Sequence, residues 1–535
     1  MADTSDSHVA VIGAGPAGLS AIKSLMEEGF HVSAFEKRDG PGGIWHYTAD
    51  PNITSVTTKT RSQLSRFMTP LSDFPHAPGT SRHPTGEELG NYYQQYADHF
   101  NLSDKITYGV IVESIKRDDS TSKWLISIEG ESSPRSFDKV VVATGGENGR
   151  RWPSIENIDA FEGTYIHGQE YKDAEKYAGK NVIVIGQGNS AGDCAVEVSK
   201  HANRVHIAHR RGALILPRIV DGMRFDHIAS WKLIRLGYWL SRWLPPVHRW
   251  AFNHVSDAAS KSSWGKLDPS WKFDHEYRYA TNIATFLVSD SLIPALRDGT
   301  IISVPYIKRV VGPRSVQLTD GSTIDDVDCM IACTGYESSM KNICDAVPYS
   351  KPAPDIHELP HLYQNIFPVD HADSLAFVCH SAFMENVVIC RELAAMAVAQ
   401  IWAGKSTLPP EEEMDRQIQG HLKWYAKRCR DNAPVSQLEG VVEPDSWLRW
   451  VHDKAGTGMY DKLGWTFEGV KFSLLNPRLY WQLAYGVGSP HLFRLFETGK
   501  RKAWPGALDA IKTANRESAQ DLKESLEERK ATKIA

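Results

Sequence analysis

The chain has 535 residues and a formal net charge of −5, and its 41% hydrophobic content is typical of a soluble globular protein with two or three domains. No basic tract is long enough to indicate binding to nucleic acid. The seven cysteines include no C-x-x-C pair, and their odd number argues against a full disulfide set, so we expect a cytoplasmic protein. A polar N-terminus and the lack of an apolar run of about 18 residues predict neither a targeting peptide nor a membrane-spanning helix.

The N-terminal part of the chain carries a glycine-rich turn between an apolar run and a helical pattern. Four apolar residues at 9–12 predict a buried parallel strand, and Gly13, Gly15 and Gly18 follow at the spacing of a dinucleotide-binding turn. Such glycines permit a sharp bend, close approach of a pyrophosphate and tight packing of the next helix. The following predicted strand ends in Glu36, where an acidic residue would bind the adenosine ribose. Together these features favour a nucleotide site over a plain structural turn.

The region after Glu36 continues this predicted domain. A Gly-Gly-Ile-Trp loop contains Gly43 and Trp45, and its place beside a nucleotide site favours contact with a cofactor ring over a simple core aromatic. Residues 84–100 have the periodicity of a helix. Residues 106–115 and 124–128 alternate like strands of a small antiparallel sheet.

A second dinucleotide turn lies near residue 185. Residues 181–185 predict its strand, Gly186 and Gly188 match its first two glycines, and Ser190 opens the predicted helix. Ala191 replaces the third glycine, which this motif tolerates. The chain therefore carries two nucleotide sites rather than one.

The second turn differs from the first in charge. The strand that follows it ends in Arg210 and Arg211 instead of an acid. Planar guanidinium groups match phosphate oxygens, so this position suits the 2′-phosphate of NADP, whereas Glu36 suits the free ribose of FAD. A solvated basic turn is the alternative, and the complete fingerprint before it favours NADP.

An aromatic and basic segment occupies residues 226–256. Its tryptophans alternate with lysine and arginine, and its leucines keep helical spacing. We interpret it as a helical flap over the active site or as a subunit contact. A basic amphipathic helix on a membrane surface is the alternative.

Two similar strand ends, at residues 139–145 and 330–336, indicate where the chain leaves and re-enters one nucleotide-binding domain. The predicted fold is α/β, with two Rossmann-like dinucleotide-binding domains, the second inserted in the first, and a helical C-terminal region. The predicted boundaries are 1–170 for the first part of the FAD domain and 171–330 for the NADP domain, with a helical insertion near 220–285. Residues 331–535 complete the FAD domain and the C-terminal region.

A third motif identifies the family that the chain resembles. Residues 161–171 read F-x-G-x-x-x-H-x-x-x-Y directly before the second turn. With the two turns, this pattern resembles the flavin-containing monooxygenases, single-component enzymes that use FAD and NADPH. The loops at 42–45, 188–191 and 332–336 also match, whereas the C-terminal third adds little.

The resemblance implies roles for individual residues. The residues that match the family's FAD contacts are Gly13, Gly15, Gly18, Glu36, Gly43 and Trp45. Those that match its NADP contacts are Gly186, Gly188, Ser190 and Arg211, with Arg210 beside it. The family usually has an asparagine beside the flavin, ten residues before an Asp-Phe-Pro; here that position is Gln63, the implied catalytic residue. We expect no apolar membrane-anchoring tail like that of the animal enzymes.

The resemblance also implies a reaction. NADPH reduces FAD, oxygen adds to give a hydroperoxyflavin, and a soft nucleophile, nitrogen or sulfur, of a small organic substrate takes up one oxygen atom. Such chemistry needs no catalytic triad. It also needs no metal, and His201, His206 and His209 form no H-E-x-x-H pattern.

The sequence leaves three alternatives to N- or S-oxygenation open. Baeyer–Villiger enzymes, which oxygenate ketones, usually end the signature in Trp, whereas this chain has Tyr171. An uncoupled NADPH oxidase would release hydrogen peroxide, and the longer side chain of Gln63 makes that test worthwhile. The third alternative is a membrane or interaction protein that holds FAD without turnover, and the aromatic segment is its only support. The sequence does not identify the substrate, and it leaves a homo-oligomer and a peripheral membrane contact open.

Overall fold

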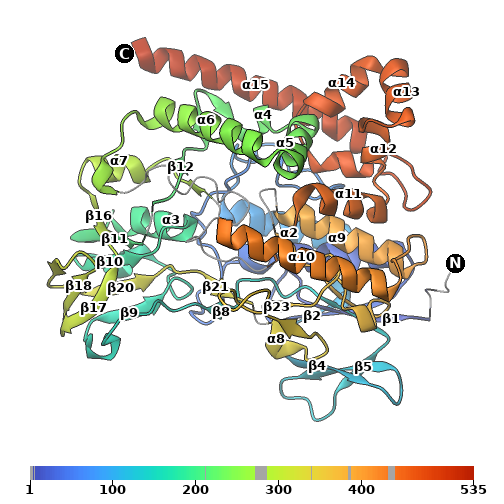
Figure 1. Cartoon of the computed structure of the whole chain (residues 1–535), viewed down its shortest axis with the longest axis horizontal. Coiled ribbons are helices and arrows are strands. Elements are labelled where there is room, and N and C mark those ends of the chain that lie inside the picture. The colour runs from blue at the N-terminus through green and yellow to red at the C-terminus, as the bar shows by residue number, and fades with distance from the viewer. Residues whose placement is uncertain are drawn as a thin grey trace.

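A computed structural model of the chain describes residues 4, 6–210, 212–271, 286–338, 340–382, 387–431 and 440–534 (Figure 1). Two five-stranded parallel sheets form the centre of the described structure. Helices surround them, and most of the C-terminal third is helical.

The first sheet contains the first glycine-rich turn. Its strand order is β24-β7-β1-β2-β3, and every neighbouring pair is parallel. Central strands buried on both faces explain the continuous apolar runs in the sequence. The strands are β1 (His8–Ile12), β2 (His31–Glu36), β3 (Ile106–Tyr108), β7 (Lys139–Val142) and β24 (Leu375–Phe377).

The prediction of an antiparallel pair at 106–115 and 124–128 is partly wrong. The antiparallel sheet consists of β4 (Val112–Asp118), β5 (Lys123–Ile128) and β6 (Arg135–Phe137). β3 instead pairs in parallel with β2 and extends the first sheet. Alternation in a short segment reports a half-buried strand but not the direction of its partner.

The second sheet repeats this arrangement around the second turn. Its order is β16-β11-β10-β20-β9, again all parallel. β9 pairs with β20, so this sheet already includes residues that precede the predicted boundary at 170. The boundaries at 170 and 330 stay predictions. The strands are β9 (Thr164–His167), β10 (Asn181–Ile185), β11 (Arg204–His209), β16 (Ile301–Pro305) and β20 (Cys329–Ala332).

The two similar strand ends mark the passages between the sheets. The chain leaves the first sheet after β7 and returns toward it after β20, so the second sheet is inserted between β7 and β24. The two crossing segments, β8 (Gly149–Arg150) and β21 (Tyr336–Glu337), pair antiparallel. They lie between the two sheets in Figure 1.

The helices cover the sheets and fill the C-terminal third. α1 (Pro16–Glu27) packs against α9 (Val387–Trp402), and α3 (Asn189–Val198) follows the second turn. Helix α2 (Gly86–His99) confirms the predicted helix at 84–100, and its N-terminus has a capping box between Thr85 and Glu88. The C-terminal helices are α10 (Glu411–Asp431), α11 (Pro444–Ala455), α12 (Met459–Leu463), α13 (Phe467–Leu475), α14 (Pro477–Tyr485) and α15 (Ala507–Ile534).

The insertion after β11 contains α4 (Phe225–Ile228), α5 (Trp231–Trp243) and α6 (Pro245–Trp264). Figure 1 shows α15, in red, running along this insertion at the top of the view. Buried Arg224 forms an ion pair of 3.2 Å with Asp521 of α15. The shorter elements are β12 (Ile215–Leu216), β13 (Ile219–Val220), β14 (Met223–Arg224), β15 (Leu287–Val288), α7 (Leu292–Arg297), β17 (Ile307–Gly312), β18 (Ser315–Leu318), β19 (Thr323–Ile324), α8 (Met340–Ile343), β22 (Tyr349–Ser350) and β23 (Leu359–Pro360).

Candidate active site

The first turn has the geometry that its glycines predict. Gly13 has a φ of +105°, and a Cβ there would lie 2.6 Å from the carbonyl oxygen of Ala143. A Cβ on Gly18 would lie 1.9 Å from the Gly13 carbonyl oxygen, so only glycine allows α1 to pack this close to the turn. α1 begins after Gly15, and no described side chain caps it. Its first N–H groups are therefore available to an anion.

Glu36 connects the end of β2 to this turn. Its carboxylate is buried and accepts hydrogen bonds from the backbone N–H of Ala14 at 2.7 Å and of Arg38 at 3.0 Å. These bonds hold the acidic group beside the start of α1, as the sequence predicts. A carboxylate has further acceptor capacity for the hydroxyl groups of a ligand.

A cavity of about 340 Å³ lies in front of the turn. Its walls include most of the residues predicted to contact FAD, namely Gly13, Gly15, Glu36, Gly43 and Trp45. Gly18 is buried behind them, where it sets the packing of α1.

Two arginines in this cavity were missed by the sequence analysis. Arg38 and Arg391 both line it, and the Nε of each is buried without a hydrogen-bond partner among the described residues. Unpaired buried donors are costly, and an anionic ligand would satisfy them. The sequence could have indicated Arg38 as a ligand contact, because it lies two residues after Glu36 at the end of β2. Arg391 had none, because only the packing of α9 brings it to the cavity.

The second turn has the same backbone design. Gly186 has a φ of +131°, and a Cβ there would lie 2.3 Å from the Cys333 carbonyl oxygen. Gly188 precedes α3, which no described side chain caps. A Cβ on Gly188 would meet no described atom within 4 Å, so the space in front of this turn is free. The neighbouring Gln187 has a buried Nε2 without a partner in the described structure.

The arginines after β11 are only partly described. Arg210 is exposed at the end of β11, where its guanidinium lies 4.3 Å from the ring centroid of Tyr306 and donates to the Tyr306 hydroxyl at 3.0 Å. This stacking holds the guanidinium plane in place. Arg211 lies outside the described residues.

A second cavity, of about 410 Å³, lies between the two turns. Ser190 at the start of α3 lines it on one side, and Gln63 lines it on the other. It shares part of its wall with the first cavity, because the same residues border both, namely Ile44, Trp45, Thr54, Glu147 and Val388. The two cavities therefore adjoin each other along these residues.

The comparisons with known proteins agree with this geometry. The family model described as "Flavin-binding monooxygenase-like" matches residues 6–534. The chain belongs to this family.

The relatives of this monooxygenase span nearly its whole length. The monooxygenase aurF of Gibberella zeae is 34% identical over 520 residues, which cover 95% of this chain and 97% of aurF. Flavin-containing monooxygenase 5 of Oryctolagus cuniculus is 30% identical and covers 95% of this chain and 91% of its own. The solved S-allyl-L-cysteine S-oxygenase of Allium sativum has a TM-score of 0.61 at 21% identity and covers 95% of this chain and 99% of its own, which shows the shared fold. The predicted family, fold class and cofactors, FAD and NADP, are thereby confirmed, and the chain is an FAD-dependent NADPH monooxygenase.

Hydrogen bonds from Arg218 connect the loop that carries Gln63 to the insertion after β11. Arg218 donates hydrogen bonds of 3.2 Å to the carbonyl oxygens of both Arg61 and Ser62. It also forms an ion pair of 2.7 Å with Asp290. Gln63 itself is an exposed side chain in the wall of the second cavity. Arg218 lines the same cavity, so it positions the loop from the side of the second sheet.

The family signature crosses between the two sheets. The ring of His167 lies 3.0 Å from the Gly335 carbonyl oxygen, in the segment that returns from β20. Gln169 donates from its amide to the Thr54 hydroxyl at 2.7 Å, which joins the second domain to the wall of both cavities. Tyr171 donates to Glu197 of α3 at 2.9 Å. The signature therefore fixes how the two turns face each other.

Acidic side chains also border the second cavity. Burial raises the pKa of Asp193 to about 6, and the nearby charge of Glu197 adds to this shift while Arg218 opposes it. The N-terminus of α3 and this carboxyl group thus lie on the same wall. Among the described residues of the insertion, Arg218 lines this cavity, whereas the residues of α5 do not.

Proposed function

We propose that this monooxygenase oxygenates a nitrogen or sulfur atom of a small organic substrate, using NADPH and O₂. The observation that carries the proposal is that the cavity beside the first turn adjoins the cavity that Ser190 and Gln63 line. FAD, when bound, supplies the redox and oxygen chemistry, and the protein binds, orients and shields it.

The first cavity fits FAD. The N–H groups at the start of α1 and the unpaired Nε donors of Arg38 and Arg391 would hold its negatively charged phosphates. Glu36 would accept hydrogen bonds from the ribose hydroxyls. Gly15, Gly43 and Trp45 would border the bound group, since they line the cavity.

The second turn fits NADP. The uncapped start of α3, with Gly188 and Ser190, would hold the phosphates that link the two nucleosides. Arg210 would bind the 2′-phosphate, and we assign Arg211 the same role from the sequence.

Gln63 would orient the reacting groups. Its amide both donates and accepts hydrogen bonds, so it can hold the edge of the flavin ring and keep water ordered near it. Arg218 would keep this amide in place through the backbone of residues 61 and 62. The walls of the second cavity would limit the access of bulk water to the reacting atoms.

The substrate class rests on the relatives. The structural neighbour from Allium sativum is named as an S-oxygenase, and a relative from Oryctolagus cuniculus, 26% identical, is named as an N-oxide-forming dimethylaniline monooxygenase. Nitrogen and sulfur are soft nucleophiles that share one requirement, an electrophilic oxygen held away from water. We propose the same chemistry for this chain.

A substrate panel tests the proposal. NADPH consumption would be measured with thioethers, amines and ketones, and hydrogen peroxide would be measured in parallel. We expect oxygenated product to account for most of the NADPH consumed with a thioether or an amine. Product from ketones alone would support a Baeyer–Villiger enzyme instead, and peroxide equal to NADPH with every compound would support an oxidase.

The cellular location is also a proposal. All seven cysteines are described, and none of them forms a disulfide. Free thiols are usual in reducing compartments, which supports the cytoplasm. No helix among the described residues is long and apolar enough to cross a membrane.

A further inference from the structure

The stretch of chain that carries Gln63 lies against α15, the last helix of the chain. We call residues 61–67 the Gln63 segment. Within it, Arg66 forms ion pairs of 3.3 Å with Asp521 and of 3.6 Å with Glu517, both on α15. Arg66 and Asp521 are 455 positions apart in the sequence, so only the tertiary fold brings them together.

The stretch that supports the Gln63 segment from behind contacts the same helix. The N–H of Ser62 donates to the carbonyl oxygen of Pro84 at 2.8 Å, and the N–H of Arg66 donates to that of Arg82 at 3.0 Å. The side chain of Arg82 in turn forms an ion pair of 3.6 Å with Asp521. One carboxylate of α15 therefore binds both hydrogen-bonded stretches.

Apolar packing accompanies these ion pairs. Phe67, next to Arg66, forms a buried cluster with Val487 and with Ala514 of α15. The guanidinium of Arg66 lies 4.7 Å from the ring centroid of Phe67. This packing limits the access of water to the ion pairs, so their attraction is screened less than that of an exposed pair.

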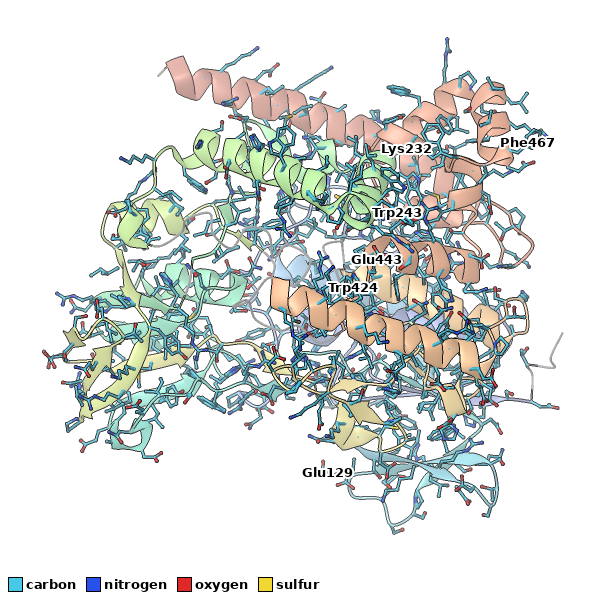
Figure 2. The ribbon with its side chains drawn as sticks, viewed as in Figure 1. Glu129, Lys232, Trp243, Trp424, Glu443 and Phe467 are labelled. Atoms are coloured by element: carbon cyan, nitrogen blue, oxygen red, sulfur yellow. The ribbon has the colours of Figure 1, made fainter. Side chains whose placement is uncertain are left out.

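Asp521 is the point where the contacts of α15 meet. Its side chain is only 8% exposed, and a third guanidinium, that of the buried Arg224 in the insertion, lies 3.2 Å away. In Figure 2, α15 crosses the top of the view, and side chains fill the space between it and the insertion that carries Lys232 and Trp243. Three guanidinium groups around one buried carboxylate depend on its charge, because a neutral side chain would leave them facing one another.

Gln63 thus lies between two anchors. On one side, Arg218 holds the carbonyl oxygens of residues 61 and 62. On the other side, Asp521 holds Arg66. The Gln63 side chain is exposed in the wall of the second cavity and forms no hydrogen bond with any residue that the structure describes. Its position is therefore set by the backbone that carries it.

We propose that α15 holds Gln63 in its working position, with Asp521 as the positioning residue. The inference rests on the proposed role of Gln63 beside the flavin. Asp521 lines neither of the two cavities, so it acts through the Gln63 segment. When its charge is lost, the segment moves more freely, and more NADPH is spent on the side reaction in which NADPH, a proton and O₂ give NADP⁺ and hydrogen peroxide.

Peroxide release by the purified, FAD-loaded full chain tests this inference. NADPH consumption and hydrogen peroxide would be measured without any organic substrate, so the result does not depend on the substrate class. Asp521→Asn keeps the shape of the side chain and removes its charge. We expect it to release peroxide about threefold faster or more. Anaerobic reduction of its flavin by NADPH should keep the wild-type rate, because both nucleotide turns are unchanged.

Further variants separate positioning from a general loss of stability. Gln63→Ala/Asp521→Asn should release peroxide no faster than Gln63→Ala alone, because Asp521 acts through Gln63. Asp521→Glu keeps the charge and should stay close to the wild type. Arg66→Gln leaves Asp521 paired with Arg82 and Arg224, so it should fold and should release peroxide as Asp521→Asn does.

Glu527→Gln on the same helix is the matched control. Glu527 is exposed and forms no ion pair within the described part of the chain, so its peroxide release should equal that of the wild type. Unchanged release in Asp521→Asn and Arg66→Gln, with faster release in Gln63→Ala, would overturn this inference and leave the role of Gln63 intact. Unchanged release in Gln63→Ala would overturn both. Additive effects in the double variant would show that α15 acts by another route.

Discussion

At the scale of single residues, Gly188 offers the cleanest test of the second nucleotide site. Its φ of −91° suits any residue, and a Cβ there would meet no described atom. Gly188→Ala should therefore fold normally and keep its FAD, while the methyl group would meet only what binds at the start of α3. We expect the KM for NADPH to rise about tenfold or more, since one charge-assisted hydrogen bond to phosphate contributes about 1.5–3 kcal/mol.

The matched variant is Gly186→Ala, because Gly186 lies in the same turn but has no room for a Cβ. It should lower the thermal stability of the protein. Equal loss of stability in both variants, measured by thermal unfolding, would contradict a binding role for the free space at Gly188.

Arg210 is expected to determine the preference for NADPH over NADH. Arg210→Ala removes a guanidinium that Tyr306 holds in place, and Arg210→Ala/Arg211→Ala removes the proposed phosphate site altogether. The KM for NADPH should rise about tenfold or more, whereas the KM for NADH should change little, because NADH lacks the 2′-phosphate. Arg204→Ala, at the opposite end of β11, is the control. Unchanged discrimination in the double variant would refute the assignment.

Gln63 is expected to control how tightly NADPH consumption is coupled to oxygenation of the substrate. Gln63→Ala should increase the fraction of NADPH that appears as hydrogen peroxide, because the amide would no longer order the groups beside the flavin. Gln63→Asn keeps an amide, in the asparagine that the family usually has here, and should keep coupling close to that of the wild type. A peroxide yield that is equal in all three proteins would show that Gln63 does not take part.

At the scale of elements, a buried charge cluster joins α1, α9 and the segment near residue 494. Asp73 lies 2.6 Å from Lys23 and 3.3 Å from Arg494, and its pKa is lowered: these two cations and hydrogen bonding outweigh burial, which alone would raise it. Glu392 accepts a hydrogen bond of 2.6 Å from Ser72, but burial raises its pKa to about 7. The cluster therefore contains one acid that resists ionisation.

This cluster predicts a pH effect on stability. Between the unfolded pKa of Glu392, 4.5, and its folded pKa, about 7, the folded state holds more protons than the unfolded state. The stabilising effect of the protonated acid is complete below this range and is lost as the pH rises through it. Glu392→Gln stays neutral, so its Tm should fall less between pH 5 and pH 8 than that of the wild type. Parallel Tm profiles would contradict the raised pKa.

Some elements could be predicted from the sequence, and others could not. The turns around Gly13 and Gly186 have local causes, because a positive φ and a close backbone contact admit only glycine. β3 was assigned to the wrong sheet, because strand direction depends on a distant partner. The burial of Trp231 against the exposure of Trp243 follows from how α5 packs, which the helical spacing alone does not determine.

At the scale of the whole molecule, the sequence predicts the two dinucleotide-binding turns but not the cavities that adjoin each other near them. Glu36 and Arg210 each indicate a cofactor through local charge. That the cavities share Trp45 and Thr54 depends on contacts such as the one from Gln169 to Thr54, which bridge residues 115 positions apart. The same long-range packing brings Arg391 to the first cavity.

Electron transfer from NADPH at the second turn to FAD at the first is the central step, and anaerobic reduction of the bound flavin measures it directly. The purified protein should be yellow, and NADPH should bleach its flavin without oxygen or substrate. NADH should do so far more slowly, because it lacks the phosphate that Arg210 and Arg211 would bind. A folded protein without flavin, or bleaching at equal rates by NADPH and NADH, would contradict the account.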